Sequence, residues 1–299
     1  MQPGLWAWQR NLVRKAPKNT IVLLGSSRMA FGFDQDEWVR CGGHSRPFML
    51  AWPGGCPRPH LHDLATDDSF RGTVLVGVAP DLFFCGPDQK YPMRVKHQVS
   101  LARNWGPADE IEQRIRFIIE PWLSVLLKGE TSLLARLRYS FQLPQRDGQL
   151  PAMRPRMFAR CDRHGRMRMV EGFEKRPDDM MAVRRWLQSW EPQMGFYPTP
   201  DPESIVNSVV KDVEAIRQRG GKVIFVRYPS TGYMRDQERK TRPRSEYWDR
   251  LIADTGCPSV HFEDHDELSN FDCPEWSHLT QSDAIKFTHR LYAIINSDP

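Results

Sequence analysis

Short apolar runs rich in Val, Ile and Leu recur along this 299-residue chain, and glycine or proline bounds most of them. Such runs are typical of strands buried on both faces of a parallel sheet. They are Ile21–Leu24, Phe48–Ala51, Val74–Val78, Val223–Val226 and, more weakly, Val260–Phe262. Helical patterns fall between or after them at Asp34–Arg40, Arg58–Ala65, Pro202–Arg219 and Gln281–Ile295. The alternation predicts one α/β domain over residues 1–299, a doubly wound (flavodoxin-like) three-layer sandwich with about five parallel strands.

A long interruption, from about residue 86 to residue 201, separates the third and fourth predicted strands. Two amphipathic helix patterns, Ala108–Lys128 and Ser132–Phe141, make it mainly helical. A strand–turn–strand pattern follows, with Met157–Cys161 and Met167–Val170 on either side of a turn at residues 162–165. We interpret the interruption as an insertion that caps the domain, and the same pattern also fits a small separate module.

Composition and charge narrow the classes of function. The net charge of +5 on 34.8 kDa is modest, and basic residues are not interleaved with aromatic ones, so we expect no nucleic-acid partner. The six cysteines are scattered without a C-x-x-C pair, which predicts neither a metal site nor a disulfide framework. No Walker or dinucleotide-binding glycine motif occurs, so we expect no cofactor.

Hydropathy bears on localisation. No stretch of the sequence is long and apolar enough to cross a membrane, so we expect no membrane span. Residues 1–19 carry cationic side chains but lack the apolar core of a signal peptide. As written, the sequence predicts a cytoplasmic protein. A periplasmic or membrane-anchored protein is the alternative if a further segment precedes Met1.

Two short motifs near opposite ends of the chain carry the candidate chemistry. Gly25-Ser26-Ser27-Arg28 follows the first predicted strand directly, and Glu275-Trp276-Ser277-His278 lies just ahead of the last predicted helix. A serine hydroxyl becomes a good nucleophile when a histidine takes its proton and a carboxylate holds the other ring nitrogen. We therefore predict a catalytic triad of Ser27, His278 and Glu275.

Three loops are expected to converge on this serine. In a doubly wound sheet, ligands bind at the carboxyl ends of the strands near the point where the strand order reverses. Residues 25–28, 52–55 and 79–81 all fall at such ends. The backbone N–H group of Ser27, with that of Gly54 or Gly55, would then donate to the oxyanion of an acyl-transfer reaction.

These motifs resemble the SGNH (GDSL-like) hydrolase superfamily, from Ile21 to the C-terminus but outside the insertion. Gly25-Ser26-Ser27 stands where the family has Gly-Asp-Ser. With Arg28 included, the motif resembles the Gly-x-Ser-Arg pattern of a branch of uncharacterised bacterial SGNH-like proteins. The family also has an acidic residue three positions before its histidine. Trp52-Pro53-Gly54-Gly55 falls where it supplies an oxyanion glycine, and the resemblance slightly favours Gly55.

Two positions depart from the family pattern. The family's third block, Gly-x-Asn-Asp, contributes an asparagine to the oxyanion hole, whereas this chain has Gly77-Val78-Ala79-Pro80-Asp81. Loss of one such donor costs about 10²–10³ in turnover. In addition, Glu275 stands where the family usually has aspartate.

The resemblance implies a serine hydrolase or acyltransferase whose partner is a small-molecule or glycan ester, best matched by an O-acetyl group on a glycan. Arg28 and Arg227, both at predicted strand ends, would bind an anionic group of that substrate or else stabilise the loops through salt bridges. The missing asparagine also allows a catalytically degenerate SGNH-like binding or assembly protein. The residue 25–28 loop alone would fit a weaker alternative, a phosphoryl-binding site.

Overall fold

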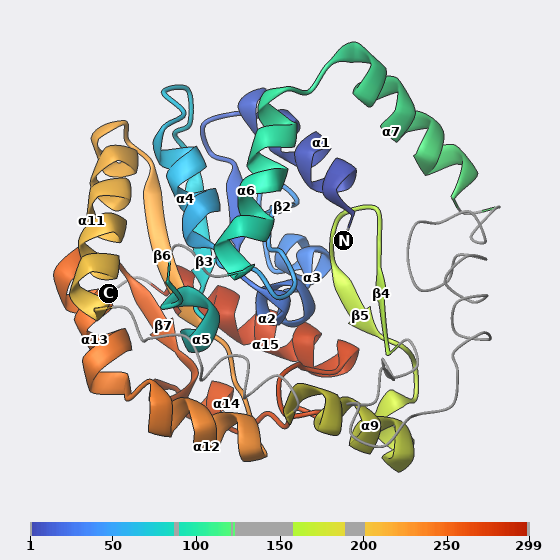
Figure 1. The fold of residues 1–299 in the computed structure, drawn as a ribbon, viewed down its shortest axis with the longest axis vertical. Helices are drawn as coiled ribbons and strands as arrows, with labels where there is room; N and C mark the ends of the chain where they lie inside the picture. Colours follow the sequence, from blue (N-terminus) through green and yellow to red (C-terminus); the bar gives the residue numbers. More distant parts are fainter. Residues whose placement is uncertain (1, 87–89, 121, 123–157, 189–200, 298–299) are drawn as a thin grey trace.

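Five parallel strands form the central sheet of the protein in a computed structural model (Figure 1). The structure describes residues 2–86, 90–120, 122, 158–188 and 201–297. The strands, in the spatial order β2-β1-β3-β6-β7, are β2 (Phe48–Met49), β1 (Ile21–Leu24), β3 (Thr73–Gly77), β6 (Lys222–Arg227) and β7 (Ser259–His261). β2 is added on one side of β1 and the later strands on the other, so the strand order reverses beside β1, as in other doubly wound sheets. The predicted three-layer α/β fold is confirmed.

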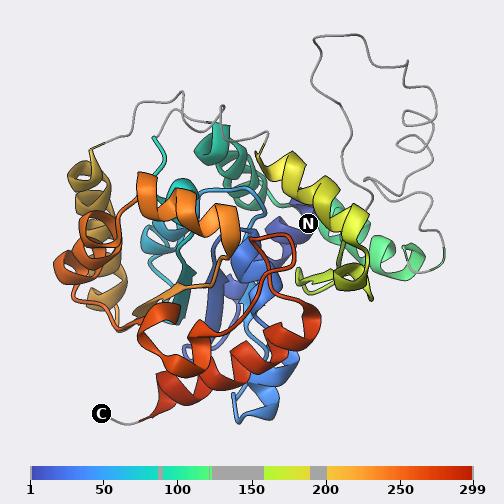
Figure 2. The ribbon, with the colours of Figure 1, turned by 90° about the horizontal axis from the view of Figure 1, so that it is seen from below.

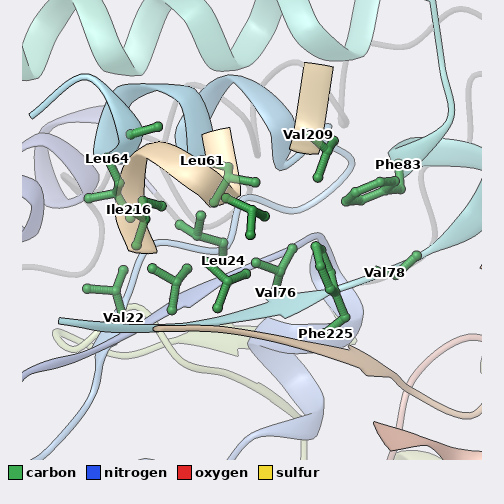
Figure 3. Close-up of a cluster of buried hydrophobic side chains, with 14 of the residues drawn as sticks. Val22, Leu24, Leu61, Leu64, Val76, Val78, Phe83, Val209, Ile216 and Phe225 are labelled. Atoms are coloured by element: carbon green, nitrogen blue, oxygen red, sulfur yellow. The ribbon is translucent and has the colours of Figure 1, made fainter. Parts of the chain in front are cut away.

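Helices cover both faces of the sheet because successive strand residues point to opposite sides. Val22 and Leu24 pack against one layer and Leu23 against the other. The first layer holds α1 (Pro3–Arg14), α4 (Arg58–Ala65), α6 (Lys90–Arg103), α11 (Pro202–Gln218) and α13 (Arg244–Thr255). The second holds α2 (Ser27–Gly32), α3 (Gln35–Arg40), α14 (Asp266–Ser269) and α15 (Gln281–Asn296). Figure 3 shows α4 and α11 closing the first core with leucine, isoleucine and valine side chains.

Helix α1 was not predicted, and it covers the outer edge of the sheet. The Trp6 indole N–H donates to the Leu50 carbonyl at 2.8 Å, and the Gln9 amide oxygen accepts the Met49 N–H at 3.1 Å. A sheet edge left open would present unpaired backbone groups. Side chains of α1 therefore provide hydrogen-bond partners for backbone groups at the end of β2 and just beyond it.

The predicted insertion is seen in part. Helix α7 (Pro107–Ile119) begins where the first helix pattern was expected, and the second pattern, Ser132–Phe141, lies outside the described residues. Strands β4 (Ala159–Cys161) and β5 (Met167–Met169) pair antiparallel, as the strand–turn–strand pattern predicts. A short 3-10 helix, η2 (Phe173–Lys175), and α9 (Pro177–Gln188) follow.

The β4–β5 hairpin and α9 pack onto the α/β domain beside α2. Phe31 of α2 lies in a buried cluster with Met169, Phe173 and Val183. Arg166, buried in the hairpin, forms an ion pair with the equally buried Asp34. This part of the insertion therefore rests directly on the helix that follows β1 (Figures 1 and 2).

The remaining short elements lie at the carboxyl ends of the strands. They are α5 (Pro80–Phe83) after β3, α12 (Gly232–Thr241) after β6 and the 3-10 helix η3 (Phe262–Asp264) after β7. Within the described parts of the chain, no helix has the length and apolar character needed to cross a membrane.

Candidate active site

Ser27, His278 and Glu275 lie in one hydrogen-bonded row. Ser27 is the first residue of α2, and its Oγ is 2.7 Å from Nε2 of His278. The other ring nitrogen, Nδ1, is 2.8 Å from Oε1 of Glu275. The carboxylate is fully buried and the imidazole nearly so, while Ser27 is half-buried. The structure thus brings together the three residues predicted as a triad, with the spacing that acyl-transfer triads use.

A tight loop presents Glu275 and His278 to each other. Oε1 of Glu275 also accepts the backbone N–H of His278 at 2.7 Å, so the carboxylate is fixed by two bonds to one residue. Between them, Trp276 has a φ of 74°. Among the described residues it is the one non-glycine residue with a positive φ. Its N–H donates to the Cys273 carbonyl at 2.7 Å and its carbonyl accepts the Thr231 N–H at 3.0 Å. Backbone strain of this kind persists where surrounding contacts hold it.

Aromatic rings enclose the histidine. Phe31 stacks on the His278 ring with centroids 4.4 Å apart, and Phe158, just before β4, lies at 6.2 Å. Neither residue was predicted as part of the site, since no motif marks them. An apolar wall limits water around the imidazole and restricts the orientations of the ring. The insertion therefore contributes directly to the surroundings of His278.

Helix α9 of the insertion also braces the loop that carries the acid. Arg184 donates two hydrogen bonds to the Pro274 carbonyl, at 3.0 and 2.7 Å, and its guanidinium lies 5.0 Å from the centre of the Trp276 ring. Gly232 also packs close to this ring, since a Cβ on Gly232 would come within 2.7 Å of the indole. Contacts with Arg184 and Gly232 therefore fix the Trp276 side chain, which supports its unusual backbone conformation.

Gly25 sets the turn from β1 into α2. It has a φ of 156°, and a Cβ there would lie 2.6 Å from Cβ of Met29 and 3.3 Å from the Gly77 carbonyl oxygen. Only glycine allows α2 to start this close to the strand ends. The close approach places Ser27 at the carboxyl edge of β1, where the sequence predicted the nucleophile.

The Trp52–Gly55 loop lies alongside this turn. The Trp52 N–H donates to the Gly25 carbonyl at 2.9 Å, and the Gly55 N–H donates to the Trp52 carbonyl at 2.9 Å. With Pro53 and then Gly54 at a φ of 64°, the loop is a type II turn. The N–H of Gly55, the slightly favoured oxyanion donor, is thus already bonded within the turn. In the described chain no acceptor is found for the N–H of Gly54.

Arg28 and Arg227 point to the same buried carboxylate. Each places Nη2 2.5 Å from an oxygen of Glu238 in α12, and Ser230 Oγ donates to that carboxylate at 2.7 Å. Both guanidinium groups are therefore engaged in a buried salt-bridge cluster, which corresponds to the loop-stabilising alternative. Glu238 was not singled out from the sequence, because nothing in the charged segment 234–240 marks it as buried.

Electrostatics within this cluster favour the ionised carboxylate. Burial would raise the pKa of Glu238, but the guanidinium groups of Arg227 and Arg28 outweigh it and lower the pKa to about 2. Burial also lowers the pKa of Arg227. Nε of Arg28 donates to Ser277 Oγ at 3.3 Å, next to the histidine. The cluster thus connects Arg28, the residue after Ser27, to Ser277, the residue before His278.

Comparison of the chain with family models, with curated proteins and with solved structures gave no match.

The segment after β3 supplies no amide side chain to the site. The Val78 N–H donates to the Val226 carbonyl at 2.9 Å, and Ala79 precedes the short helix α5. Asp81 in that helix is directed toward Arg242, with 3.8 Å between Oδ1 and Nε. Burial, with the nearby Glu238 carboxylate, raises the pKa of Asp81. Any oxyanion donors near Ser27 would therefore come from the loops after β1 and β2.

Proposed function

We propose that the protein is a serine hydrolase or acyltransferase that acts on an ester. Ser27 is the nucleophile, His278 the general base and acid, and Glu275 the residue that orients the histidine. The observation that carries the proposal is the row of contacts from a fully buried carboxylate through the imidazole to a half-buried hydroxyl, at 2.8 and 2.7 Å. The position of Ser27 at a strand–helix turn supports it further.

The reaction proceeds by acyl transfer. Ser27 Oγ attacks the ester carbonyl while Nε2 of His278 takes its proton, and Glu275 stabilises the imidazolium that forms. The N–H groups of Ser27 and Gly54 donate to the oxyanion. His278 then gives the proton to the departing alcohol. Water, or the hydroxyl of an acceptor, attacks the acyl-enzyme with His278 again acting as base and restores Ser27.

The resemblance to SGNH hydrolases supports the choice of substrate. Gly-x-Ser-Arg after the first strand and the acid-x-x-His motif before the last helix stand in that family's positions, and relatives of this kind act on O-acyl groups of carbohydrates. A short acyl group, best an O-acetyl group on a glycan, is the substrate class we propose.

Labelling with a fluorophosphonate probe tests this directly, because it reports an activated serine without knowledge of the substrate. We expect intact-mass analysis to show one adduct on the parent and none on Ser27→Ala, with at least 100-fold slower labelling of His278→Ala. Ser26→Ala is the matched control, since the adjacent Ser26 side chain makes no capping bond, and it should label like the parent. A folded parent that remains unlabelled would overturn the proposal.

A binding or assembly protein with the same fold is the second candidate. It is favoured by the engaged N–H of Gly55 and by the absence of an asparagine in residues 77–81, which together reduce the oxyanion donors. This candidate predicts no labelling of the parent and no hydrolysis of acetyl esters. Retention of ester binding by Ser27→Ala and parent alike would then support it.

A further inference from the structure

We propose that Glu37, Cys41 and His289 form a zinc-binding site between α3 and α15. The three ligand atoms converge at one point on the surface of the second helical layer. His289 Nδ1 lies 3.0 Å from Glu37 Oε1 and 3.4 Å from Cys41 Sγ, and the sulfur lies 3.6 Å from the same carboxylate oxygen. Each residue offers one ligand atom, and all lie within 4.8 Å of one another.

These distances match one face of a tetrahedral zinc site. Zinc binds thiolate sulfur at about 2.3 Å and imidazole nitrogen or carboxylate oxygen at about 2.0–2.2 Å. Tetrahedral angles then give edges of about 3.4 Å between nitrogen and oxygen and about 3.6 Å between sulfur and either. The observed separations of 3.0, 3.4 and 3.6 Å differ from these edges by a few tenths of an ångström at most.

Helix α3 and its C-terminal residue place the Glu37 and Cys41 side chains next to each other. Glu37 and Cys41 are four residues apart at the end of α3, so they are neighbours on one helical face. Arg40 Nη2 lies 2.8 Å from the second carboxylate oxygen, Oε2, which leaves Oε1 directed at the other two ligands. A partner of this kind on a ligating carboxylate is common around metal sites.

Access and ligand type favour zinc among divalent ions. The His289 side chain is 67% exposed, whereas that of Glu37 is 10% exposed, so an ion reaches the site from solvent and meets a fixed carboxylate. A set of one thiolate, one imidazole and one carboxylate suits zinc better than magnesium or calcium, which prefer oxygen. Water completes the fourth position.

A metal here would join the elements that follow the two halves of the triad. Helix α3 follows α2, which begins at Ser27, and α15 begins shortly after His278 (Figure 2). The ion would therefore act as a structural cross-link between α3 and α15. The inference does not depend on the proposed hydrolase activity.

Zinc binding to the full chain tests the site. In equilibrium dialysis with metal analysis we expect one Zn²⁺ per chain, and at least tenfold weaker binding for Cys41→Ser and for His289→Gln. Two matched controls exist: Cys161, an exposed cysteine, and His62, an exposed histidine 2.8 Å from the Asp212 carboxylate. Cys161→Ser and His62→Gln should bind zinc like the parent.

Thermal unfolding gives a second readout that also controls for folding. With a chelator present, Cys41→Ser should unfold at the same temperature as the parent, and zinc should raise only the parent's Tm, because a ligand that binds the folded state stabilises it. The proposal is overturned if the parent binds no Zn²⁺ at micromolar concentration. It is equally overturned if the site variants and the controls lose zinc to the same extent.

Discussion

Replacing Glu238 by glutamine tests the buried salt-bridge cluster that Arg28, next to Ser27, forms with Arg227 and Glu238. The substitution keeps the shape of the side chain and a hydrogen bond to Ser230, but it leaves Arg28 and Arg227 without their shared carboxylate. The side chains of the two arginines are only 7% and 6% exposed, so water cannot compensate for the lost charge. Breaking a buried ion pair by removing one partner costs about 3–5 kcal/mol.

The lowered pKa of Glu238 indicates a stabilisation of similar size. The fall of this pKa from 4.5 to about 2 corresponds to about 3 kcal/mol of preference for the ionised form in the folded protein. Because the folded-state pKa is depressed, this stability is present above pH 4.5 and is lost as the pH falls toward 2. For a domain of this size, 3–5 kcal/mol lowers Tm by roughly 10 °C.

The assay is thermal and urea unfolding of Glu238→Gln at pH 7, with Glu263→Gln as the matched control. Glu263 also holds two arginines, Arg235 and Arg239, but its side chain is 26% exposed, so its removal should cost no more than about 1 kcal/mol. We also expect Glu238→Gln to slow probe labelling of Ser27, since Arg28 is adjacent to it. Equal Tm values for the two variants at pH 7 would refute the reasoning.

Three further substitutions probe other parts of the structure. Gly25→Ala should destabilise the protein by about 1–3 kcal/mol in urea unfolding, because the new Cβ would lie 2.6 Å from Cβ of Met29. Unchanged stability would contradict the close approach of α2 to the end of β1. Burial lowers the pKa of His60 to about 3, so the free energy of unfolding of the parent should fall by about 3 kcal/mol as the pH falls from 6.5 to 4. His60→Phe should therefore show a shallower fall of Tm over that range, and parallel profiles of the two proteins would contradict a neutral, buried His60. Arg184→Met removes two bonds to the Pro274 carbonyl and should slow probe labelling several-fold with little change in Tm, whereas an unchanged rate would show that α9 does not support the site.

Elements with a strong local pattern were predicted closely. The strand Ile21–Leu24 and the helix Arg58–Ala65 have the predicted bounds, because an apolar run or a helical period needs only neighbouring residues. Helix α1 was missed, since its burial depends on contacts such as that of Trp6 with Leu50, 44 residues away. Helix α2 has only six residues, too few for a period to show.

The sequence predicted that Ser27, Glu275 and His278 belong together, and the structure places them in one hydrogen-bonded row. The prediction was possible because a strand-terminal serine and an acid-x-x-His motif are local patterns. It did not reveal Phe31 as the ring that stacks on His278, nor Glu238 as the partner of Arg28, 210 residues away. Those roles depend on which surfaces face each other after folding.

By itself, then, the sequence determined the alternation of strands and helices and the two motifs, one after the first strand and one before the last helix, since both are written in consecutive residues. Only the tertiary structure decided that Gly55 is bonded within its turn, that Arg28 and Arg227 share one buried carboxylate, and that Cys41 meets His289 from 248 residues away. Hydrogen bonds and ion pairs act over a few ångströms in space, whatever the separation along the chain. Partners brought together by packing cannot be read from spacing alone.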